Sequence, residues 1–243
     1  MSRCPLGKML FFSGVITYIT VSRRRSSSQK PKTSDGKKHV IFVLGGPGAG
    51  KGTVCERLIP PTSTPTPTPT PISSNHAFFS AGDLLRAERN TNSPTAKIIN
   101  SKISNGNFVP AEITVGLINK AFSNSKADIF LLDGFPRNID NVTAWEEVIG
   151  DSITIDFVLF LDCPEDIMLG RIIERGRTSN RSDDNLETAR KRFANFRKDS
   201  MPIVKKFEAQ GKVHNVRADR PVDDVYLDCK KLVESNMKAI LLL

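Results

Sequence analysis

The amino-acid sequence predicts an α/β fold in which helices cover both faces of a doubly wound parallel sheet. Short apolar runs alternate with helix-like segments along most of the chain, and this alternation is typical of such sheets. A glycine-rich stretch, GGPGAGKGT, follows the first apolar run at Gly45, and two later runs end in Asp133 and Asp162. Ligands of doubly wound folds bind at the carboxyl ends of the strands, so these residues indicate where a site lies.

The strands are predicted from five short segments. They are KHVIFVLGG with its strand at residues 39–44, AFFS at residues 77–80, DIFLLDG, IDFVLFLDCP and KVHNVR. The third and fourth are largely apolar runs, as expected of central parallel strands that are buried on both faces. Pro164 closes the fourth.

Helices are predicted between and after these strands. The expected helices are one starting near Gly52, AGDLLRAER from about Ala81, SPTAKIINSKIS, PAEITVGLINKAF, DNVTAWEEVIG, PEDIMLGRIIERG, LETARKRFANFRKDSMPIVKKFEAQG with an interruption near Pro202, and PVDDVYLDCKKLVESN. Pro110 suits the start of its helix, and Gly176 stands where glycine usually stops a helix. We expect DNVTAWEEVIG to be an exposed helix and RTSNRSDDN to be a polar loop.

A Thr-Pro tract follows the start of the first helix. Pro60 and Pro61 end that helix, and Ile59 is disfavoured in it because a proline follows, so only about two turns can form. Residues 60–76 are then a Thr/Pro-rich insertion, and such repeats favour an extended or disordered segment. The tract is either part of the natural protein or the product of a retained intron or other gene-model error.

The net charge of +9 is concentrated in a leader. Residues 1–38 hold nine Lys and Arg side chains and a single acid, Asp35, whereas the other 205 residues carry 26 basic and 25 acidic side chains. The rest of the chain is therefore close to neutral. This distribution removes the main support for a nucleic-acid-binding function.

The leader also contains the apolar stretch MLFFSGVITYITV. Its thirteen residues fall short of the roughly 20 that span a bilayer, and we expect no membrane span elsewhere. A basic, Ser-rich and nearly acid-free leader is typical of a mitochondrial or plastid address, or of a signal-like segment. The alternative is a disordered or wrongly assigned start.

The cysteines provide no metal-binding pattern. The chain has four, namely Cys4, Cys55, Cys163 and Cys229. They lie far apart and form no CxxC pair or Cys/His cluster, so the sequence predicts no structural zinc site. Free thiols in a reducing compartment are the simplest interpretation.

The stretch GGPGAGKGT is suited to binding phosphate. Gly45, Gly48 and Gly50 let the backbone turn its N–H groups towards phosphate oxygens, which side chains would keep away. Lys51 adds a positive charge for the β- and γ-phosphates. The alternative is a glycine turn with a surface lysine, and the position of the stretch directly between a strand and a helix disfavours it.

The loop departs in one respect from the pattern GxxxxGK[ST] of P-loop NTPases. Gly52 follows the lysine and the hydroxyl comes one residue later, at Thr53, a variant found in nucleoside monophosphate kinases. From His39 to about Val233 the sequence resembles this family, and within it most closely the eukaryotic UMP-CMP kinases. Six blocks occur in family order and spacing: VLGGPGAGKGT, SAGDLLRAE, GNFVPAEIT, LLDGFPRNIDN, LDCPEDIML and RTSNRSDDN.

The resemblance implies ATP-dependent phosphorylation of CMP, UMP and dCMP, with Mg²⁺ entering with ATP. This chemistry needs two anions held in line and the charge of the transferring group neutralised, for which arginine forks are well shaped. The residues implied to bind ATP are Gly48, Ala49, Gly50, Lys51, Gly52, Thr53, Arg175 and Arg220. Those implied to bind the acceptor are Arg86, Asn107, Phe108, Val109, Gly134, Phe135, Pro136, Arg137, Asn141, Arg181 and Arg192.

The residues that the resemblance implies in catalysis are Lys51, Asp133, Arg137, Arg181 and Arg192. Arg86 and Arg137 would hold the acceptor phosphate, while Arg181 and Arg192 would close onto the transferring phosphates with a lid. Asp133 ends a Walker-B-like strand and is expected to orient the waters of Mg²⁺, with no direct protein ligand to the metal.

The lid is expected to be the short kind, at about residues 175–185. The resemblance implies that Arg175 stacks against ATP and that Arg220 contacts the ATP base through its backbone. Asn180 stands where the family usually has glycine, and Asn tolerates a left-handed backbone better than most residues.

Two positions favour a pyrimidine acceptor over AMP. Asn141 stands where adenylate kinases usually have glutamine, and a shorter amide suits a smaller base. Ala81 stands where adenylate kinases usually have threonine. An adenylate kinase is the first alternative, and a catalytically impaired nucleotide-binding relative, suggested by the insertion at residues 60–76, is the second.

The predicted organisation is a leader at residues 1–38 and one kinase domain at residues 39–243, with a part that binds the acceptor at about residues 81–110. The expected partners are ATP and CMP or UMP. We expect a monomer in the cytoplasm and nucleus that spans no membrane and binds no nucleic acid. The alternative location is the mitochondrion or plastid, through the leader.

Overall fold

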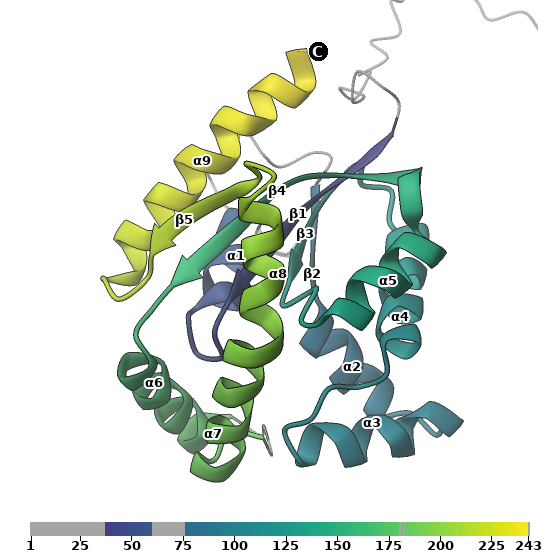
Figure 1. The fold of residues 1–243 in the computed structure, drawn as a ribbon, viewed down its shortest axis with the longest axis vertical. Helices are drawn as coiled ribbons and strands as arrows, with labels where there is room; N and C mark the ends of the chain where they lie inside the picture. The colour runs from purple at the N-terminus through teal and green to yellow at the C-terminus, as the bar shows by residue number, and fades with distance from the viewer. Residues whose placement is uncertain (1–36, 60–75, 180, 182, 243) are drawn as a thin grey trace, which may run out of the picture.

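The computed structural model of the chain describes residues 37–59, 76–179, 181 and 183–242. They form a parallel sheet with the strand order β2-β3-β1-β4-β5 and with helices packed around it (Figure 1). The strands are β1 (Lys38–Gly45), β2 (His76–Ser80), β3 (Ile129–Asp133), β4 (Ile153–Asp162) and β5 (Val213–Arg217). The predicted doubly wound α/β fold is confirmed.

The helices follow the strands in the predicted order. They are α1 (Lys51–Leu58), α2 (Ala81–Arg89), α3 (Pro94–Ser104), α4 (Ala111–Asn124), α5 (Ile139–Val148), the 3-10 turn η1 (Gly150–Ser152), α6 (Glu165–Thr178), α7 (Leu186–Asn195), the π-helical turn η2 (Phe196–Ser200), α8 (Met201–Glu208) and α9 (Val222–Leu242). Several of them start at a side chain that accepts a hydrogen bond from the first turn. Ser80, Ser93, Asn138 and Asn185 cap α2, α3, α5 and α7 in this way, which satisfies N–H groups that have no partner inside the helix.

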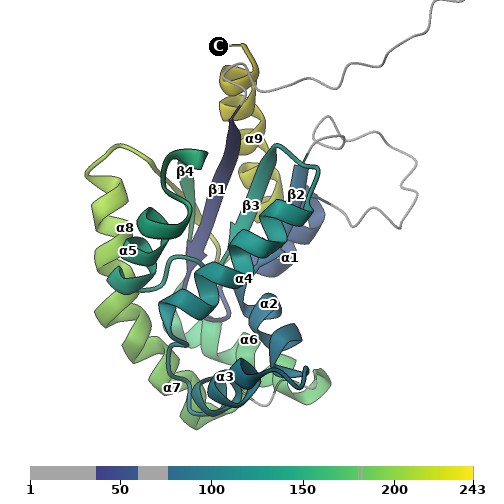
Figure 2. The ribbon, with the colours of Figure 1, turned by 90° about the vertical axis from the view of Figure 1, so that its right-hand side faces the viewer.

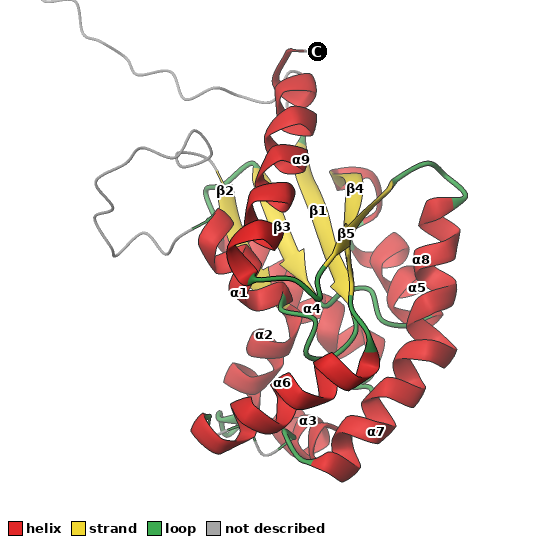
Figure 3. Ribbon diagram, turned by 90° about the vertical axis from the view of Figure 1, so that its left-hand side faces the viewer, coloured by secondary structure: helices red, strands yellow, loops and turns green. Residues whose placement is uncertain are grey.

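The alternation of side chains along β1 divides the core into two layers. Ile41 and Val43 point to the face that is covered by α1 and α9, and Figure 3 shows these two helices in front of the sheet. Val40, Phe42 and Leu44 point to the opposite face, where α4, α5 and α8 pack (Figure 2). All five side chains are buried, so the strand is apolar on both faces, as its sequence predicts.

The register of the central strands brings the predicted site residues to one edge. β1 pairs in parallel with β3 and with β4, so that Val43 lies beside Asp133 and Gly45 lies beside Leu161. The glycine-rich loop and the two acids that follow apolar runs therefore meet at the carboxyl edge of the sheet, as predicted.

The boundary between leader and domain lies slightly earlier than predicted. Lys38 is already part of β1 and pairs with Ile153, and its Nζ donates a hydrogen bond to the carbonyl oxygen of Phe122 at 2.9 Å. The predicted leader therefore ends before Lys38. Residues 1–36 lie outside the described part of the chain.

The predicted helix stop at Gly176 is wrong. Helix α6 continues to Thr178, and Gly176 lies within it. A Cβ at Gly176 would stand 2.4 Å from the carbonyl oxygen of Asp184. The residue is therefore required by close packing against the segment that follows α6, and not by a turn.

One further helix prediction is corrected. Helix α5 was expected to be exposed, but Val142, Ala144 and Trp145 are buried, and the Trp145 ring meets the Phe42 ring edge to face at 5.2 Å between centroids. The interruption predicted near Pro202 in the long helix after the lid is confirmed: η2 lies just before the proline, which itself lies within α8.

The short first helix is confirmed, because α1 ends at Leu58 and spans 8 residues. The Thr/Pro-rich insertion predicted at residues 60–76 ends one residue too late, because His76 is the first residue of β2. Its residues 60–75 lie outside the described residues. Within the part of the chain that the structure describes, none of the helices has the length and apolar character needed to cross a membrane.

Candidate active site

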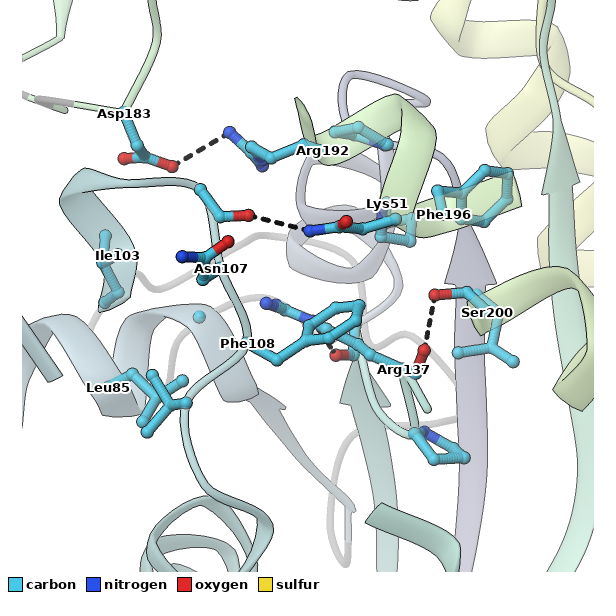
Figure 4. Close-up of a pocket in the computed structure, with 18 of the residues that line it drawn as sticks. Lys51, Leu85, Ile103, Asn107, Phe108, Arg137, Asp183, Arg192, Phe196 and Ser200 are labelled. Carbon is cyan, nitrogen blue, oxygen red and sulfur yellow. Dashed lines mark hydrogen bonds and ion pairs between the residues drawn. The ribbon is translucent and has the colours of Figure 1, made fainter. Parts of the chain in front are cut away.

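A cavity of about 130 Å³ opens at the carboxyl edge of the sheet (Figure 4). Its lining is Leu44, Gly45, Pro47, Lys51, Gly82, Leu85, Arg86, Ile103, Gly106, Asn107, Phe108, Val109, Gly134, Pro136, Arg137, Asp183, Arg192, Asn195, Phe196, Ser200 and Val204. Four of these side chains are cationic, whereas the single acid among these described lining residues is Asp183. The cavity therefore suits an anion with an apolar or planar part.

The glycine-rich loop uses its glycines in two different ways. Gly48 and Gly50 have φ angles of 87° and 91°, in the left-handed region that favours glycine. A Cβ at Gly48 would stand 2.4 Å from the carbonyl oxygen of Met168, whereas a Cβ at Gly50 would meet no described atom within 4 Å. Gly48 therefore allows the loop to pack on α6, and Gly50 opens the start of α1. The N–H groups at such a helix start are suited to bind phosphate.

The loop also holds the amino group of Lys51. Its Nζ donates hydrogen bonds to the carbonyl oxygens of Gly45 and Gly46, both at 2.9 Å. Burial lowers the pKa of Lys51 from 10.5 to about 8, although the nearby carboxylate of Asp133 opposes this shift. Because its bonded partners are neutral carbonyls, the buried ammonium would be stabilised by a phosphate oxygen.

Asp133, at the end of β3, fits the role predicted for it near Mg²⁺. Its Oδ1 is buried and has no hydrogen-bond partner among the described residues, and its Oδ2 lies 3.9 Å from the position of a Cβ on Gly52. The described residues contain no group of three or more His, Cys, Asp or Glu side chains able to hold a metal. A single carboxylate beside a phosphate loop suits Mg²⁺, which keeps most of its waters and binds mainly through phosphates.

Arg137 lies deep in the cavity, on the loop that follows β3. Its Nε donates a hydrogen bond to the carbonyl oxygen of Gly134 at 2.6 Å, and its backbone N–H donates to Oδ1 of Asn141 at 3.1 Å. Burial, followed by the nearby charge of Arg192, lowers the pKa of Arg137 to about 10. The guanidinium therefore stays charged at neutral pH but lies in surroundings that favour an added anion.

Arg175 on α6 and Arg192 on α7 share two acids from the short segment between these helices. Arg175 forms a two-point ion pair with Asp184, with distances of 2.6 and 2.7 Å. Arg192 donates to Asp183 at 2.9 Å and lies 3.4 Å from Asp184. Burial alone would raise the pKa of Asp184, but the hydrogen bond from Arg175 holds it below its ordinary value. In this conformation both arginines are neutralised by carboxylates that a phosphate could replace.

Asp83 on α2 plays the same part for two further arginines. Arg86 donates its Nε to Asp83 at 3.1 Å, and one of its terminal nitrogens contacts the same oxygen. Arg181, from the segment after α6, lies 3.6 Å from that oxygen. Burial, followed by the charge of Arg86, lowers the pKa of Arg181. Helix α2 and the segment after α6 thus meet at one carboxylate.

The structure brings together many, but not all, of the predicted site residues. Those that line the cavity are Lys51, Arg86, Asn107, Phe108, Val109, Gly134, Pro136, Arg137 and Arg192. The predicted residues outside its lining are Gly48, Ala49, Gly50, Gly52, Thr53, Asp133, Phe135, Asn141, Arg175, Arg181 and Arg220. Most of the predicted ATP-binding residues fall in the second group, so the cavity is lined mainly by residues that were predicted to bind the acceptor.

Three of these outlying residues have defined local roles. Asn141 is 4% exposed and binds the backbone of Arg137, so its expected contact with the acceptor base stays a prediction. Phe135 is fully buried in the core. Arg220 pairs with Asp228 at 2.6 Å, and its expected contact with ATP stays a prediction as well.

Several lining residues were missed by the sequence reasoning. They are Leu85, Ile103, Asp183, Asn195, Phe196, Ser200 and Val204. Asp183 lies in the block RTSNRSDDN. Its negative charge, two residues after Arg181, could have identified it. Asn195 and Ser200 stood in an unremarkable helical stretch, and nothing in their spacing marked them.

Comparison with known proteins agrees with this geometry. The family model for adenylate kinase matches residues 43–212. The chain is 45% identical over 216 residues to a uridylate kinase of Saccharomyces cerevisiae, covering 87% of this chain and 98% of that protein. It is 42% identical over 206 residues to a UMP-CMP kinase of Danio rerio, covering 82% and 99%, and 42% identical over 199 residues to UMP-CMP kinase 3 of Arabidopsis thaliana, covering 82% and 91%. From the matched residues and these identities, the chain belongs to the adenylate kinase family.

Proposed function

We propose that this protein transfers the terminal phosphoryl group of ATP to the pyrimidine nucleoside monophosphates CMP and UMP, and to dCMP. The observation that carries the proposal is the cavity in which Lys51, Arg86, Arg137 and Arg192 converge. The names of the relatives, UMP-CMP kinase and uridylate kinase, support a pyrimidine acceptor.

The residues of the chain would act mainly by position and charge. Arg86 and Arg137 would hold the acceptor phosphate, and Lys51 would hold the phosphates of ATP at the start of α1. Arg192, released from Asp183, would neutralise the transferring group between them. Such electrostatic stabilisation supplies most of the catalysis in phosphoryl transfer. Mg²⁺, carried in with ATP near Asp133, would add positive charge to the phosphates.

The lid segment would exclude water from the transfer. Arg175, Arg181 and Arg192 meet acids in the described conformation, and bound phosphates would compete for the same guanidinium groups. Closure on the substrates would therefore exchange carboxylate partners for phosphate partners. We propose that the protein acts as a monomer.

The proposal is tested by measuring ADP release from ATP with CMP, UMP, dCMP and AMP as acceptors for the purified full-length protein. We expect turnover with the three pyrimidine nucleotides and little with AMP. Faster turnover of AMP than of CMP and UMP would instead identify an adenylate kinase. ATP binding without turnover of any acceptor would identify the impaired nucleotide-binding relative. Sedimentation of the same sample would test the monomer.

A further inference from the structure

Two walls of the acceptor cavity come from distant parts of the chain. One wall is the loop between α3 and α4, where Gly106, Asn107, Phe108 and Val109 line the cavity. The other is the loop after β3, where Gly134, Pro136 and Arg137 line it. The separation of these walls sets the width of the cavity between them.

Residues at the two ends of η2 hydrogen-bond to both walls. Asn195 donates its Nδ2 to the carbonyl oxygen of Gly106 at 3.0 Å. Ser200 donates its Oγ to the carbonyl oxygen of Arg137 at 2.7 Å, a bond that Figure 4 shows beside the cavity. Both side chains line the cavity themselves, so the helix that carries them connects one wall to the other.

The π-helical turn explains how two residues five positions apart can serve one cavity. In an α-helix, residues five apart are rotated by about 140° and face different directions. In a π turn the hydrogen bond spans five residues, and here the N–H of Met201 binds the carbonyl oxygen of Phe196. Asn195 and Ser200 are therefore about one turn apart and face the same side.

We propose that Asn195 and Ser200 are positioning residues that fix the width of the acceptor cavity, and that η2 serves to place them on one face. This inference rests on the proposed function. Arg192 lies one helical turn before Asn195 on α7. The arginine that faces the transferring phosphate and the wall that holds the acceptor are thereby joined through one helix.

The test separates the KM for the acceptor from the other kinetic constants. Asn195→Asp removes the donor but adds a negative charge, whereas Ser200→Ala removes the hydroxyl with no change of charge, so the KM effect is judged on Ser200→Ala and Asn195→Asp must agree with it. The loss of one such hydrogen bond is expected to raise the KM for UMP about three- to tenfold. The KM for ATP and kcat should change less than about twofold, since the walls hold the acceptor and not the triphosphate. Ser200→Thr, which keeps the hydroxyl, should restore the wild-type KM.

The matched control is Asn236→Asp. Asn236 makes the same kind of bond, from Nδ2 to the carbonyl oxygen of Leu232 at 2.8 Å, but on α9, away from the cavity. We expect the KM of the Asn236→Asp variant for UMP to equal that of the wild type. If Asn195→Asp does not fold, the pair Ser200→Ala and Ser200→Thr carries the test.

Amide hydrogen exchange of the unliganded protein provides a readout that needs no activity. We expect faster exchange at residues 105–109 in Asn195→Asp and at residues 134–138 in Ser200→Ala. An unchanged KM for UMP in both variants, an equal rise in the KM for ATP, or unchanged exchange in both loops would overturn the inference. Absence of wild-type turnover of CMP and UMP would refute the proposed function, whereas the exchange measurement would still decide the role of the two residues.

Discussion

Lys51 and Arg137 show how single residues prepare the cavity for phosphate. Burial lowers the pKa of both side chains, which means that each cation has lost water without gaining a full counter-charge. Charge that develops on a transferring phosphoryl group would meet these preorganised cations.

We predict that Lys51→Ala and Arg137→Ala each lower kcat by about 10²–10³ or more, the size of other losses of preorganised charge. Steady-state kinetics with UMP and ATP would measure the loss of kcat in each variant. The control is Lys97→Ala, because Lys97 is exposed on α3; its kcat should not change. A near-normal kcat for either site variant would show that its role is assigned wrongly.

The lowered pKa of Lys51 also predicts a pH dependence. The free enzyme should lose its proton as the pH rises through about 8, and the neutral amine attracts the triphosphate less. We therefore expect kcat/KM for ATP, which reports groups of the free enzyme, to fall above pH 8. Bound phosphates should raise the pKa of Lys51, so the fall in kcat should begin at a higher pH. Coincident profiles would contradict the prediction.

The lowered pKa of Lys51 also predicts how the free energy of unfolding changes with pH. This free energy should rise in the pH range in which kcat/KM for ATP falls. The unfolded chain keeps the Lys51 proton up to a pKa of 10.5, whereas the folded chain loses it at about 8. Between these values the unfolded state binds more protons, so the contribution of Lys51 to the free energy of unfolding rises with pH. Denaturant unfolding of Lys51→Met should lack this rise.

Helix α6 contains two glycines with opposite requirements. A Cβ at Gly176 would lie 2.4 Å from the carbonyl oxygen of Asp184, whereas a Cβ at Gly170 would meet nothing within 4 Å in the described structure. We predict that Gly170→Ala raises the melting temperature, because alanine in a helix is favoured by about 0.5–1 kcal/mol. Gly176→Ala should lower it and also lower kcat, because it displaces the acids that pair with Arg175 and Arg192.

Thermal melts and kinetics of the two alanine variants, made in parallel, would test this prediction. The same substitution in the same helix serves as its own control. Equal effects of Gly170→Ala and Gly176→Ala would show that the approach of Asp184 does not constrain the helix.

The short helix α1 leads to a second prediction at this scale. It ends at Leu58 after burying Val54, Cys55 and Leu58, and prolines follow at positions 60 and 61, a residue type that disfavours a longer helix. We predict that replacing residues 60–75 by a helix-forming segment with a short final turn raises the melting temperature. Each additional large apolar side chain that is buried contributes roughly 1.5–3 kcal/mol.

The effect of the same replacement on chemistry should be small. The phosphate loop and the first turn of α1 precede the tract, so kcat per folded molecule should stay within a few-fold. An unchanged melting temperature would mean that the tract does not limit stability. An inert protein that becomes active after the replacement would show that the tract acts on the chemistry.

Element types were predictable from the sequence, but several of their contacts were not. The strands and helices follow apolar periodicity, which reports burial along one segment. Gly176 looked like a helix stop because the clash that requires it comes from Asp184, eight residues later. Trp145 lay in a segment read as exposed because its partner, Phe42, belongs to a distant strand. Long-range packing of this kind does not change the spacing of apolar residues along one segment, so that spacing cannot predict it.

In the candidate site, too, some residues were predictable from local sequence and others were not. Lys51, Arg137 and Arg192 were identified from motif blocks, since the backbone geometry of a phosphate loop needs particular residues in sequence. Asn195 and Ser200 were missed because they bind main-chain carbonyls, which any residue provides. The π turn that aligns them cannot be recognised from periodicity, because one irregular turn leaves the apolar pattern of α7 and α8 nearly unchanged.

At the scale of the whole molecule, the charge asymmetry predicts that the leader is separable. We predict that a truncated protein beginning at Lys37 keeps its activity, whereas one beginning at Val40 is less stable. The second loses the bond from Lys38 to the carbonyl oxygen of Phe122 and the pairing of Lys38 with Ile153. Activity assays and thermal melts of the two truncated proteins would test this prediction. Equal melting temperatures would mean that the folded domain begins at Val40 or later.

For the full-length protein we propose residence in the cytoplasm and nucleus. A fluorescent protein fused after residues 1–38 would test it. Accumulation of the fusion in mitochondria or plastids would favour the targeting role of the leader instead.

The strand order has a consequence for how the chain is made. β1 lies in the middle of the sheet, and its His39 pairs with Ile129 on β3 and Thr154 on β4. On a ribosome that adds about 5–20 residues per second, these partners emerge several seconds after β1. During that interval an apolar strand has both hydrogen-bonding edges open, and such a strand is prone to pair with other chains. The period of greatest aggregation risk for this protein therefore falls during its synthesis, before β4 is available to close the sheet.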